Sequence, residues 1–157
     1  MLPENYRESE APKADAAQAV LAAVFFTVWT ADSFWLNLTT GYSAQVPSIV
    51  RTTLFASLTL LGCYLSWKAH KQIFGAVRRE PELVDYGVFR VSRHPMYLGI
   101  MMIYLGLVLS SMSMAALLVL IAIFFFYNYL AAFEEAKLTE FFGGKYLNYM
   151  KRVRRWL

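Results

Sequence analysis

The chain has 157 residues, of which 58% are hydrophobic and 17% are aromatic, and its formal net charge is +4. A soluble domain of this length is usually less apolar, so the composition predicts an integral membrane protein. The basic residues flank apolar segments and form no continuous stripe, which argues against a nucleic-acid partner. A single cysteine leaves no disulfide framework and no cysteine metal cluster.

The N-terminal residues 1–15 are polar and carry more acid than base. A secretory signal peptide starts with positive charge, so we expect a cytosolic tail here and no cleaved leader. Residues 16–67 contain two apolar segments, about 16–38 and 48–67, and each is long enough for a membrane-spanning helix. Turn-forming residues separate the two segments.

Two charged residues lie within these first spans. Asp32 is flanked by Trp29 and Trp35, and tryptophan is enriched at membrane interfaces. Asp32 is therefore either an intramembrane site or a residue of the headgroup layer, and the sequence leaves both readings open. Arg51, in the first turn of the second span, can extend outward toward Asp32.

A polar connection, residues 68–94, follows and carries more Lys and Arg than acid. Its second half mixes apolar residues with turn formers, which indicates an irregular segment packed against helix ends. Pro95 then begins a charge-free run, and proline fits the first turn of a helix because its missing N–H would have no partner there. We expect residues 95–133 to form a helical hairpin with its turn at 110–113.

The first leg of this hairpin is short for a membrane span and should lie near the bilayer normal. It contains Gly99 and Gly106, which are seven residues apart and share one helix face. Small residues on one face let a neighbouring helix approach closely. We therefore expect this face to be a helix-packing surface.

The C-terminal part, residues 134–157, begins where charge returns at Glu134 and Glu135. The glycines at 143–144 predict a helix stop, and a basic tail follows. We interpret these residues as a cytosolic helical segment.

Four spans place both termini on the same side, together with the segments that are rich in Lys and Arg. The positive-inside rule makes that side cytosolic. The predicted fold is thus an all-α, polytopic membrane helical bundle of about four transmembrane helices, a single membrane domain over residues 1–157 with both termini cytosolic.

An antiparallel hairpin brings its two ends together, so His94 and Tyr97 should be neighbours of Glu134 and Glu135. Two carboxylates at the mouth of an apolar bundle can form a cation site. Such residues also mark membrane interfaces without further function, and spacing alone leaves both readings open. The sequence has no Walker loop, dinucleotide fingerprint, nucleophile elbow or His/Cys metal spacing, so no metal is expected.

Three stretches in a fixed order, RHPxYxG from Arg93, the pair Glu134-Glu135, and FGxxYxxYxxRV from Phe142, carry a family resemblance. Over about residues 81–153 the chain resembles the integral-membrane methyltransferases of the isoprenylcysteine carboxyl methyltransferase and phospholipid methyltransferase superfamily. The resemblance implies that S-adenosylmethionine is bound inside the bundle at the cytosolic side and enclosed by the C-terminal segment.

The resemblance also assigns roles by matching positions. The implied cofactor-binding residues are Leu83, Val84, Arg93, His94, Pro95, Met96, Tyr97, Glu134 and Glu135, and the implied catalytic residues are His94, Tyr97 and Glu134. The chemistry agrees with this assignment, because a sulfonium and an ammonium suit carboxylates and aromatic faces, whereas the carboxylate of the cofactor suits His94 or Arg93. His94 is the candidate general base where an acceptor requires one.

The substrate-associated positions depart from the family pattern. Leu130 stands where the eukaryotic isoprenylcysteine enzymes have Arg, Phe89 where they have Tyr, and Arg154 where proline is usual. The expected acceptor is therefore a lipid or small lipophilic molecule with a carboxylate, amine or thiol. Two alternatives remain, a relative of the NADPH-dependent sterol-type membrane reductases and a non-catalytic membrane scaffold. The oligomeric state is left open.

Overall fold

The computed structural model describes residues 11–75 and 82–157, and in these residues all regular secondary structure is helical. In the described residues, four long α-helices, a short fifth, one π-helical segment and two 3₁₀ turns make up the fold. The long helices are α2 (Ala11–Thr30), α3 (Ser48–Phe74), α4 (Pro95–Ser111) and α5 (Met114–Phe142); the others are η1 (Ala31–Leu36), η2 (Gly41–Ala44), η3 (Gly87–Arg90) and α6 (Gly144–Arg152).

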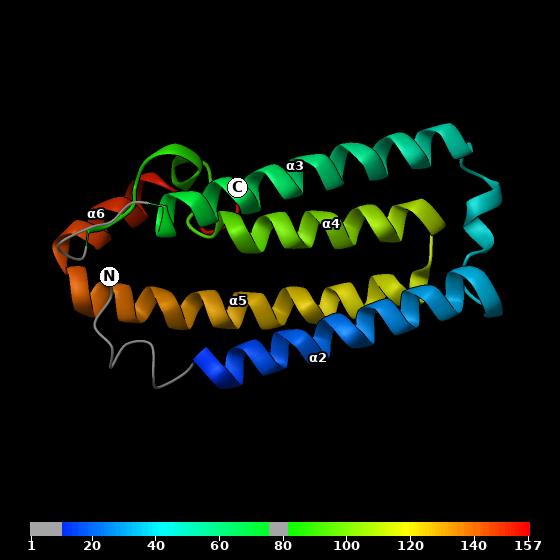
Figure 1. The fold of residues 1–157 in the computed structure, drawn as a ribbon, viewed down its shortest axis with the longest axis horizontal. Coiled ribbons are helices and arrows are strands. Elements are labelled where there is room, and N and C mark those ends of the chain that lie inside the picture. The colour runs from blue at the N-terminus through cyan, green and yellow to red at the C-terminus, as the bar shows by residue number, and fades with distance from the viewer. Residues whose placement is uncertain (1–10, 76–81) are drawn as a thin grey trace.

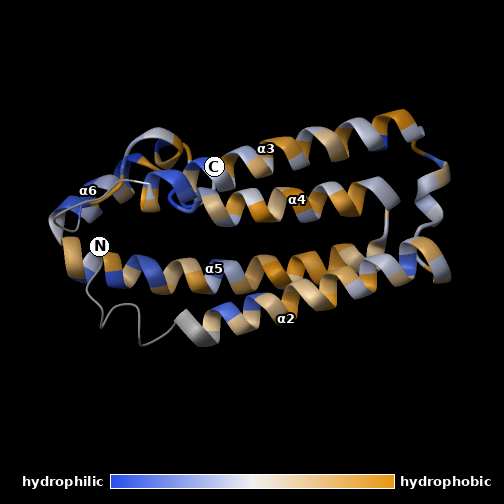
Figure 2. Cartoon of the chain, in the orientation of Figure 1, coloured by the Kyte–Doolittle hydropathy of each residue, from blue (hydrophilic) through white to orange (hydrophobic). Residues whose placement is uncertain are grey.

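Three segments are long and apolar enough to cross a membrane, namely Ala14–Leu36, Ser48–Phe74 and Met114–Phe142. The fourth apolar helix, α4, has 17 residues and is shorter, as expected for the first leg of the hairpin. Figure 2 shows apolar residues along the length of the bundle and more polar residues toward its ends. The predicted class, an all-α membrane bundle, is confirmed.

The helices are arranged in two pairs, α3 along α4 and α5 along α2 (Figure 1). Helix α4 also contacts α5, which joins the two pairs. The short helix α6 lies at the end of the bundle where α4 begins and α5 ends, so this end gathers three chain segments that are far apart in sequence.

The close contact between α3 and α4 depends on glycine. A Cβ atom on Gly99 would lie 2.5 Å from the carbonyl oxygen of Gly62, and a Cβ on Gly62 would lie 2.4 Å from that of Gly99. Gly106 is less crowded, with the carbonyl oxygen of Phe55 at 3.3 Å from its virtual Cβ. The prediction that Gly99 and Gly106 share a packing face is confirmed. No feature of the sequence identified Gly62 as the residue of α3 that Gly99 contacts.

Helix boundaries differ from the prediction at three places. Helix α2 begins at Ala11, inside the expected tail 1–15, of which residues 1–10 lie outside the described part. Helix α3 continues past residue 67 to Phe74, because residues 68–74 contain neither glycine nor proline. Helix α5 runs through the acidic pair to Phe142 and ends at the predicted glycine stop, where Gly143 has φ +54°.

Asp32 is a buried connector at the end of the bundle opposite α6. Its side chain accepts hydrogen bonds from the Thr39 N–H at 3.0 Å and from the hydroxyls of Thr39 and Ser113, each at 2.5 Å. Ser113 in turn caps α5 by accepting the Ala116 N–H at 3.1 Å. Asp32 therefore ties the end of the first span to the start of α5.

The expected approach of Arg51 to Asp32 is wrong. Arg51 Nη1 donates to the carbonyl oxygen of Ser110 at 2.7 Å, and its Nε donates to that of Val46 at 3.3 Å. Carbonyl groups at the end of α4 lack helical partners, so they are ready acceptors, while the oxygens of Asp32 already accept other hydrogen bonds.

Candidate functional site

The site is built on the turn that precedes α4, where His94 is the residue just before the helix. The His94 N–H donates to Ser92 Oγ at 3.2 Å, and the Ser92 hydroxyl donates to the carbonyl oxygen of Arg155 at 2.7 Å. The Arg93 N–H donates to the carbonyl oxygen of Arg154 at 3.1 Å. These bonds fix the C-terminal tail beside the start of α4 and hold the backbone that carries His94.

Among the described residues of this end, Glu135 has the most charged partners, and it is only 4% exposed. Its Oε1 lies 3.2 Å from His94 Nε2 and 3.3 Å from Arg93 Nη2. Arg155 binds both oxygens, with Nη2 to Oε2 at 2.7 Å and Nε to Oε1 at 3.0 Å. A bidentate guanidinium contact fixes geometry as well as charge, so the orientation of Glu135 is set from the tail.

Glu134 contacts the other side of the imidazole. Its Oε2 lies 3.4 Å from His94 Nδ1, and the Tyr97 hydroxyl donates to its Oε1. The Glu134 side chain keeps 35% exposure, unlike the buried Glu135. The hairpin prediction that His94 and Tyr97 are neighbours of the acidic pair is confirmed.

Both ring nitrogens of His94 face carboxylates, and an imidazole can donate to both only when it is protonated. Burial alone would lower the pKa of His94, but hydrogen bonds to Glu134 and Glu135 and their negative charges outweigh burial, so its pKa is raised. The hydrogen bond to Glu135 likewise raises the pKa of Arg155. The arrangement therefore favours the protonated imidazolium, which donates a hydrogen bond to each carboxylate, over the neutral imidazole, which could accept a proton.

The raised pKa of His94 predicts how stability depends on pH. The imidazolium stabilises the fold fully below the ordinary histidine value of about 6.5, and this contribution is lost as pH rises through the folded-state pKa. We therefore expect the thermal midpoint in detergent to fall across that window. The variant His94→Gln should lose this part of the slope, whereas His70→Gln, at an exposed position on α3, should keep it. Equal slopes for wild type and His94→Gln would contradict the prediction.

Aromatic rings surround the acidic pair. The rings of His94 and Tyr97 are stacked, with centroids 5.7 Å apart and planes within 2° of parallel. Tyr127 lies 4.9 Å from Tyr97, and Trp156 lies 6.1 Å from His94, in both cases between ring centroids. Aromatic faces beside the carboxylate of Glu134 are suited to a positively charged group.

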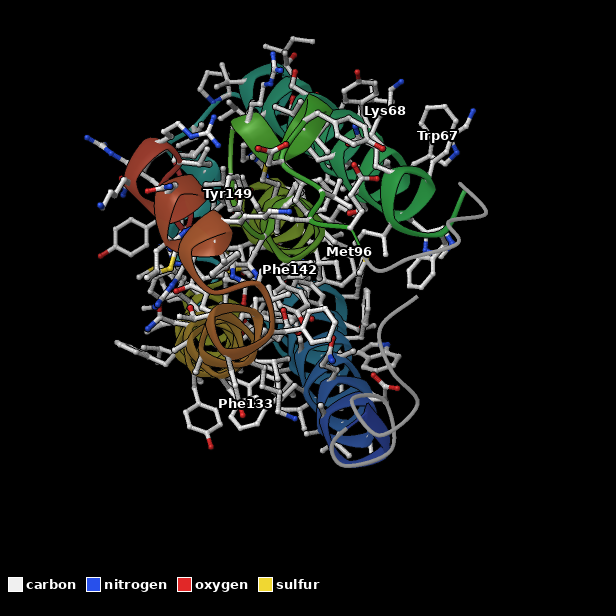
Figure 3. All side chains as sticks on the ribbon, turned by 90° about the vertical axis from the view of Figure 1, so that its left-hand side faces the viewer. Trp67, Lys68, Met96, Phe133, Phe142 and Tyr149 are labelled. Atoms are coloured by element: carbon white, nitrogen blue, oxygen red, sulfur yellow. The ribbon has the colours of Figure 1, made fainter. Side chains whose placement is uncertain are left out.

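The remaining predicted residues lie in the apolar packing at this end. Pro95 is fully buried at the first turn of α4. Leu83, Val84 and Met96 pack against the buried cluster that includes Phe89 and Tyr149. Figure 3 looks onto this end and shows Met96, Phe142 and Tyr149 toward the middle of the bundle, with Trp67 and Phe133 nearer its periphery.

Sequence reading missed three residues of the site, Asn128, Arg155 and Trp156. Asn128 Oδ1 accepts from Arg155 Nη1 at 3.1 Å and from Trp156 Nε1 at 3.3 Å. One signal was available, because an amide in the charge-free part of a membrane helix is costly unless it has a partner. Nothing in the sequence distinguishes Arg155 from the other bases of the tail.

Fold and site together define a class, an integral membrane helical bundle with an ion-paired, aromatic-lined site at one end. Within residues 11–75 and 82–157 no three His, Cys, Asp or Glu side chains are grouped so as to hold a metal ion. The family model for phospholipid methyltransferases matches residues 47–145, from the start of α3 into α6. The chain belongs to this family, which confirms the superfamily that the sequence motifs indicated.

Two curated relatives come from Arabidopsis thaliana. Protein-S-isoprenylcysteine O-methyltransferase B is 32% identical over 80 residues, covering 49% of this chain and 41% of that protein. Protein-S-isoprenylcysteine O-methyltransferase A is 33% identical over 72 residues, covering 45% of this chain and 36% of that protein. The matches therefore span well under half the length of these relatives. No solved structure matches the chain significantly.

Proposed function

We propose that the chain is an S-adenosylmethionine-dependent membrane methyltransferase. The observation that carries the proposal is the convergence of His94 and Tyr97 from α4 with Glu134 and Glu135 from α5, in a member of the phospholipid methyltransferase family. The names of both plant relatives are those of methyltransferases, which supports the same reaction class.

The donor set fits a cofactor that carries both signs of charge. Arg93 Nε and Nη1 are buried without a hydrogen-bond partner among the described residues, and guanidinium donors suit a carboxylate. The half-exposed Glu134 and the stacked rings of His94 and Tyr97 suit an ammonium and a sulfonium. In this proposal Leu83, Val84, Pro95 and Met96 supply the apolar walls, and Glu135 holds His94 and Arg93 in place.

Bound S-adenosylmethionine supplies a methyl group on a good leaving group, so the chain contributes mainly alignment and exclusion of water. Tyr97 and Glu134 orient the charged side of the site, and His94 in its protonated form donates to both carboxylates. A carboxylate acceptor has no proton to lose. An ammonium acceptor must lose one, and Glu134 is the group placed to take it, because the two carboxylates favour the protonated form of His94.

The acceptor side of the proposal is lipophilic. Leu130 lies one helical turn before Glu134 and packs against the apolar cluster that contains Tyr127. An apolar wall there suits a lipid or small lipophilic acceptor, in line with the isoprenylcysteine in the names of the relatives. The distribution of Lys and Arg supports a cytosolic site and cytosolic termini.

Binding of S-adenosylhomocysteine to the purified protein in detergent, measured by isothermal titration, tests the proposal. We expect wild type to bind and Glu134→Gln to bind about tenfold more weakly, because a charge-assisted contact is lost. Glu140→Gln, at an exposed position on the same helix, is the matched control and should bind like wild type.

Transfer of a labelled methyl group to lipid and thiol extracts, followed by mass spectrometry, then identifies the acceptor. Absence of binding by the wild type would rule the proposal out. Binding without transfer to any acceptor would favour the scaffold, and displacement of the ligand by NADPH would favour a reductase relative.

A further inference from the structure

A polar cavity lies at the opposite end of the bundle from the candidate site. Its volume is about 230 Å³, and it is lined by residues of the end of α2, η1, the η2 turn, the start of α3 and the end of α4. Figure 1 shows these segments meeting at the end farthest from α6. Hydroxyl, amide and guanidinium groups line it beside two aromatic rings; the polar residues that matter here are Ser33, Asn37, Thr40, Arg51, Ser110 and Ser111.

Arg51 gives this cavity a positive charge that no acid neutralises. It is the only Lys or Arg in residues 16–67, and residues 95–133 contain no charge. Its hydrogen bonds go to the carbonyl oxygens of Val46 and Ser110. Among the described residues it forms no ion pair, and an unpaired guanidinium within a membrane protein is costly and marks a site for an anion.

Asp32, the one acid at this end, does not serve as that partner. Its carboxylate is 4% exposed and accepts three hydrogen bonds from Thr39 and Ser113. Asp32 is also absent from the wall of the cavity. Arg51 is therefore the charged side chain that lines the cavity.

Two hydroxyl groups of the cavity, those of Ser33 and Ser111, have donor capacity left, whereas those of Thr40 and Ser110 donate within the protein. Ser33 Oγ is buried and has no hydrogen-bond partner among the described residues. Ser111 Oγ accepts from Trp29 Nε1 at 3.1 Å, which leaves its own proton free to point elsewhere. A guanidinium together with two hydroxyl donors is suited to phosphate oxygens.

The surroundings favour a lipid as the source of that phosphate. Phe34, Trp35, Leu36 and Leu38, next to the cavity in sequence, are exposed by 65%, 75%, 58% and 77%. Aromatic and aliphatic side chains so exposed at the end of a membrane bundle lie where headgroups meet acyl chains. We propose that this cavity binds the phosphodiester headgroup of a phospholipid in the leaflet opposite the candidate site, with Arg51 as its main contact.

Native mass spectrometry of the full-length protein, titrated with phosphatidylglycerol, tests the proposal. We expect saturable binding of one lipid that weakens about tenfold in Arg51→Gln, because a charge-assisted contact is lost. Arg90→Gln, an exposed base at the other end of the bundle, is the matched control and should bind like wild type. Monogalactosyldiacylglycerol, which has acyl chains and no phosphate, should bind weakly and equally to all variants.

Arg51 also donates hydrogen bonds to two carbonyl groups of the protein, so Arg51→Gln could weaken lipid binding through a folding defect. A second variant separates the two effects. Ser33→Leu would fill the cavity, and Ser33 Oγ has no partner within the described residues to lose. It should therefore weaken phosphatidylglycerol binding while leaving the thermal midpoint without lipid near that of wild type. Unchanged binding in both Arg51→Gln and Ser33→Leu would overturn the proposal. Stabilisation by inorganic phosphate that requires Arg51, without lipid binding, would overturn the assignment to a lipid.

Discussion

Replacing Glu135 with glutamine is expected to destabilise the protein by about 3 kcal/mol, the lower end of the range for breaking a buried ion pair. The substitution keeps the shape of the side chain but removes the negative charge that faces Arg93, His94 and Arg155. The Arg93 and His94 side chains are 10% and 5% exposed, so they cannot turn to water for compensation. Arg155, at 28% exposure, can do so in part, which is why the lower value is expected.

Unfolding in mixed detergent, followed by tryptophan fluorescence, measures this effect. Glu140→Gln is again the control, because it removes the same charge from an exposed position of α5. A double-mutant cycle of Glu135→Gln with Arg155→Gln should show a favourable coupling, since the two side chains share two short contacts. A stability of Glu135→Gln within about 0.5 kcal/mol of wild type, the usual range for surface substitutions, would contradict the central place given to Glu135.

The two adjacent glutamates are thereby assigned different tasks. Glu135 is buried among positive groups and holds the turn before α4, whereas Glu134 is partly exposed and forms polar contacts with His94 and Tyr97. Glu134→Gln should reduce ligand affinity with little loss of stability, and Glu135→Gln should reduce both. A single sequence presents the two as an equivalent pair, and only their different surroundings in the structure, buried for Glu135 and partly exposed for Glu134, separate them.

The hairpin part of the fold and site could be predicted because it depends on local features, namely the length of the charge-free run and the proline, serine and glycine residues that bound its helices. A charge-free run that begins with Pro95 and turns at the serines forms a helical hairpin, which brings Glu134 back beside His94. The glycine stop at residues 143–144 is equally local. These features follow from chain geometry, backbone freedom and the cost of charge in lipid.

The contacts of the C-terminal tail could not be predicted in this way. Arg155 reaches Glu135 because the tail runs back along the connection, held by the bonds of Ser92 and Arg93 to its carbonyl groups. The course of the tail depends on how α6 packs, and no sequence periodicity predicts that packing. The partners of Arg51 could not be predicted either. Its charge suggested Asp32 as a partner, but the oxygens of Asp32 accept hydrogen bonds from the hydroxyls of Thr39 and Ser113 instead.

The second large effect is expected at Gly99, where α3 and α4 approach most closely. In Gly99→Ala the new Cβ would lie 2.4 Å from Ser66 Oγ and 2.5 Å from the carbonyl oxygen of Gly62. Ser66 can rotate away, but the backbone of Gly62 cannot, so the helices must separate. We expect a loss of about 3 kcal/mol in unfolding free energy, the upper end of the usual range for overpacking.

Gly106→Ala is the matched control, because its nearest backbone contact would be 3.3 Å away, and we expect a loss below about 1 kcal/mol. The pair Gly99→Ala with Ser66→Gly should recover little stability, since the clash with Gly62 remains. Separation of α3 and α4 would also shift the first turn of α4, which carries Tyr97 and follows His94. Binding of S-adenosylhomocysteine should therefore fall with stability in Gly99→Ala, and retention of both would show that α4 tolerates a looser contact than the glycines indicate.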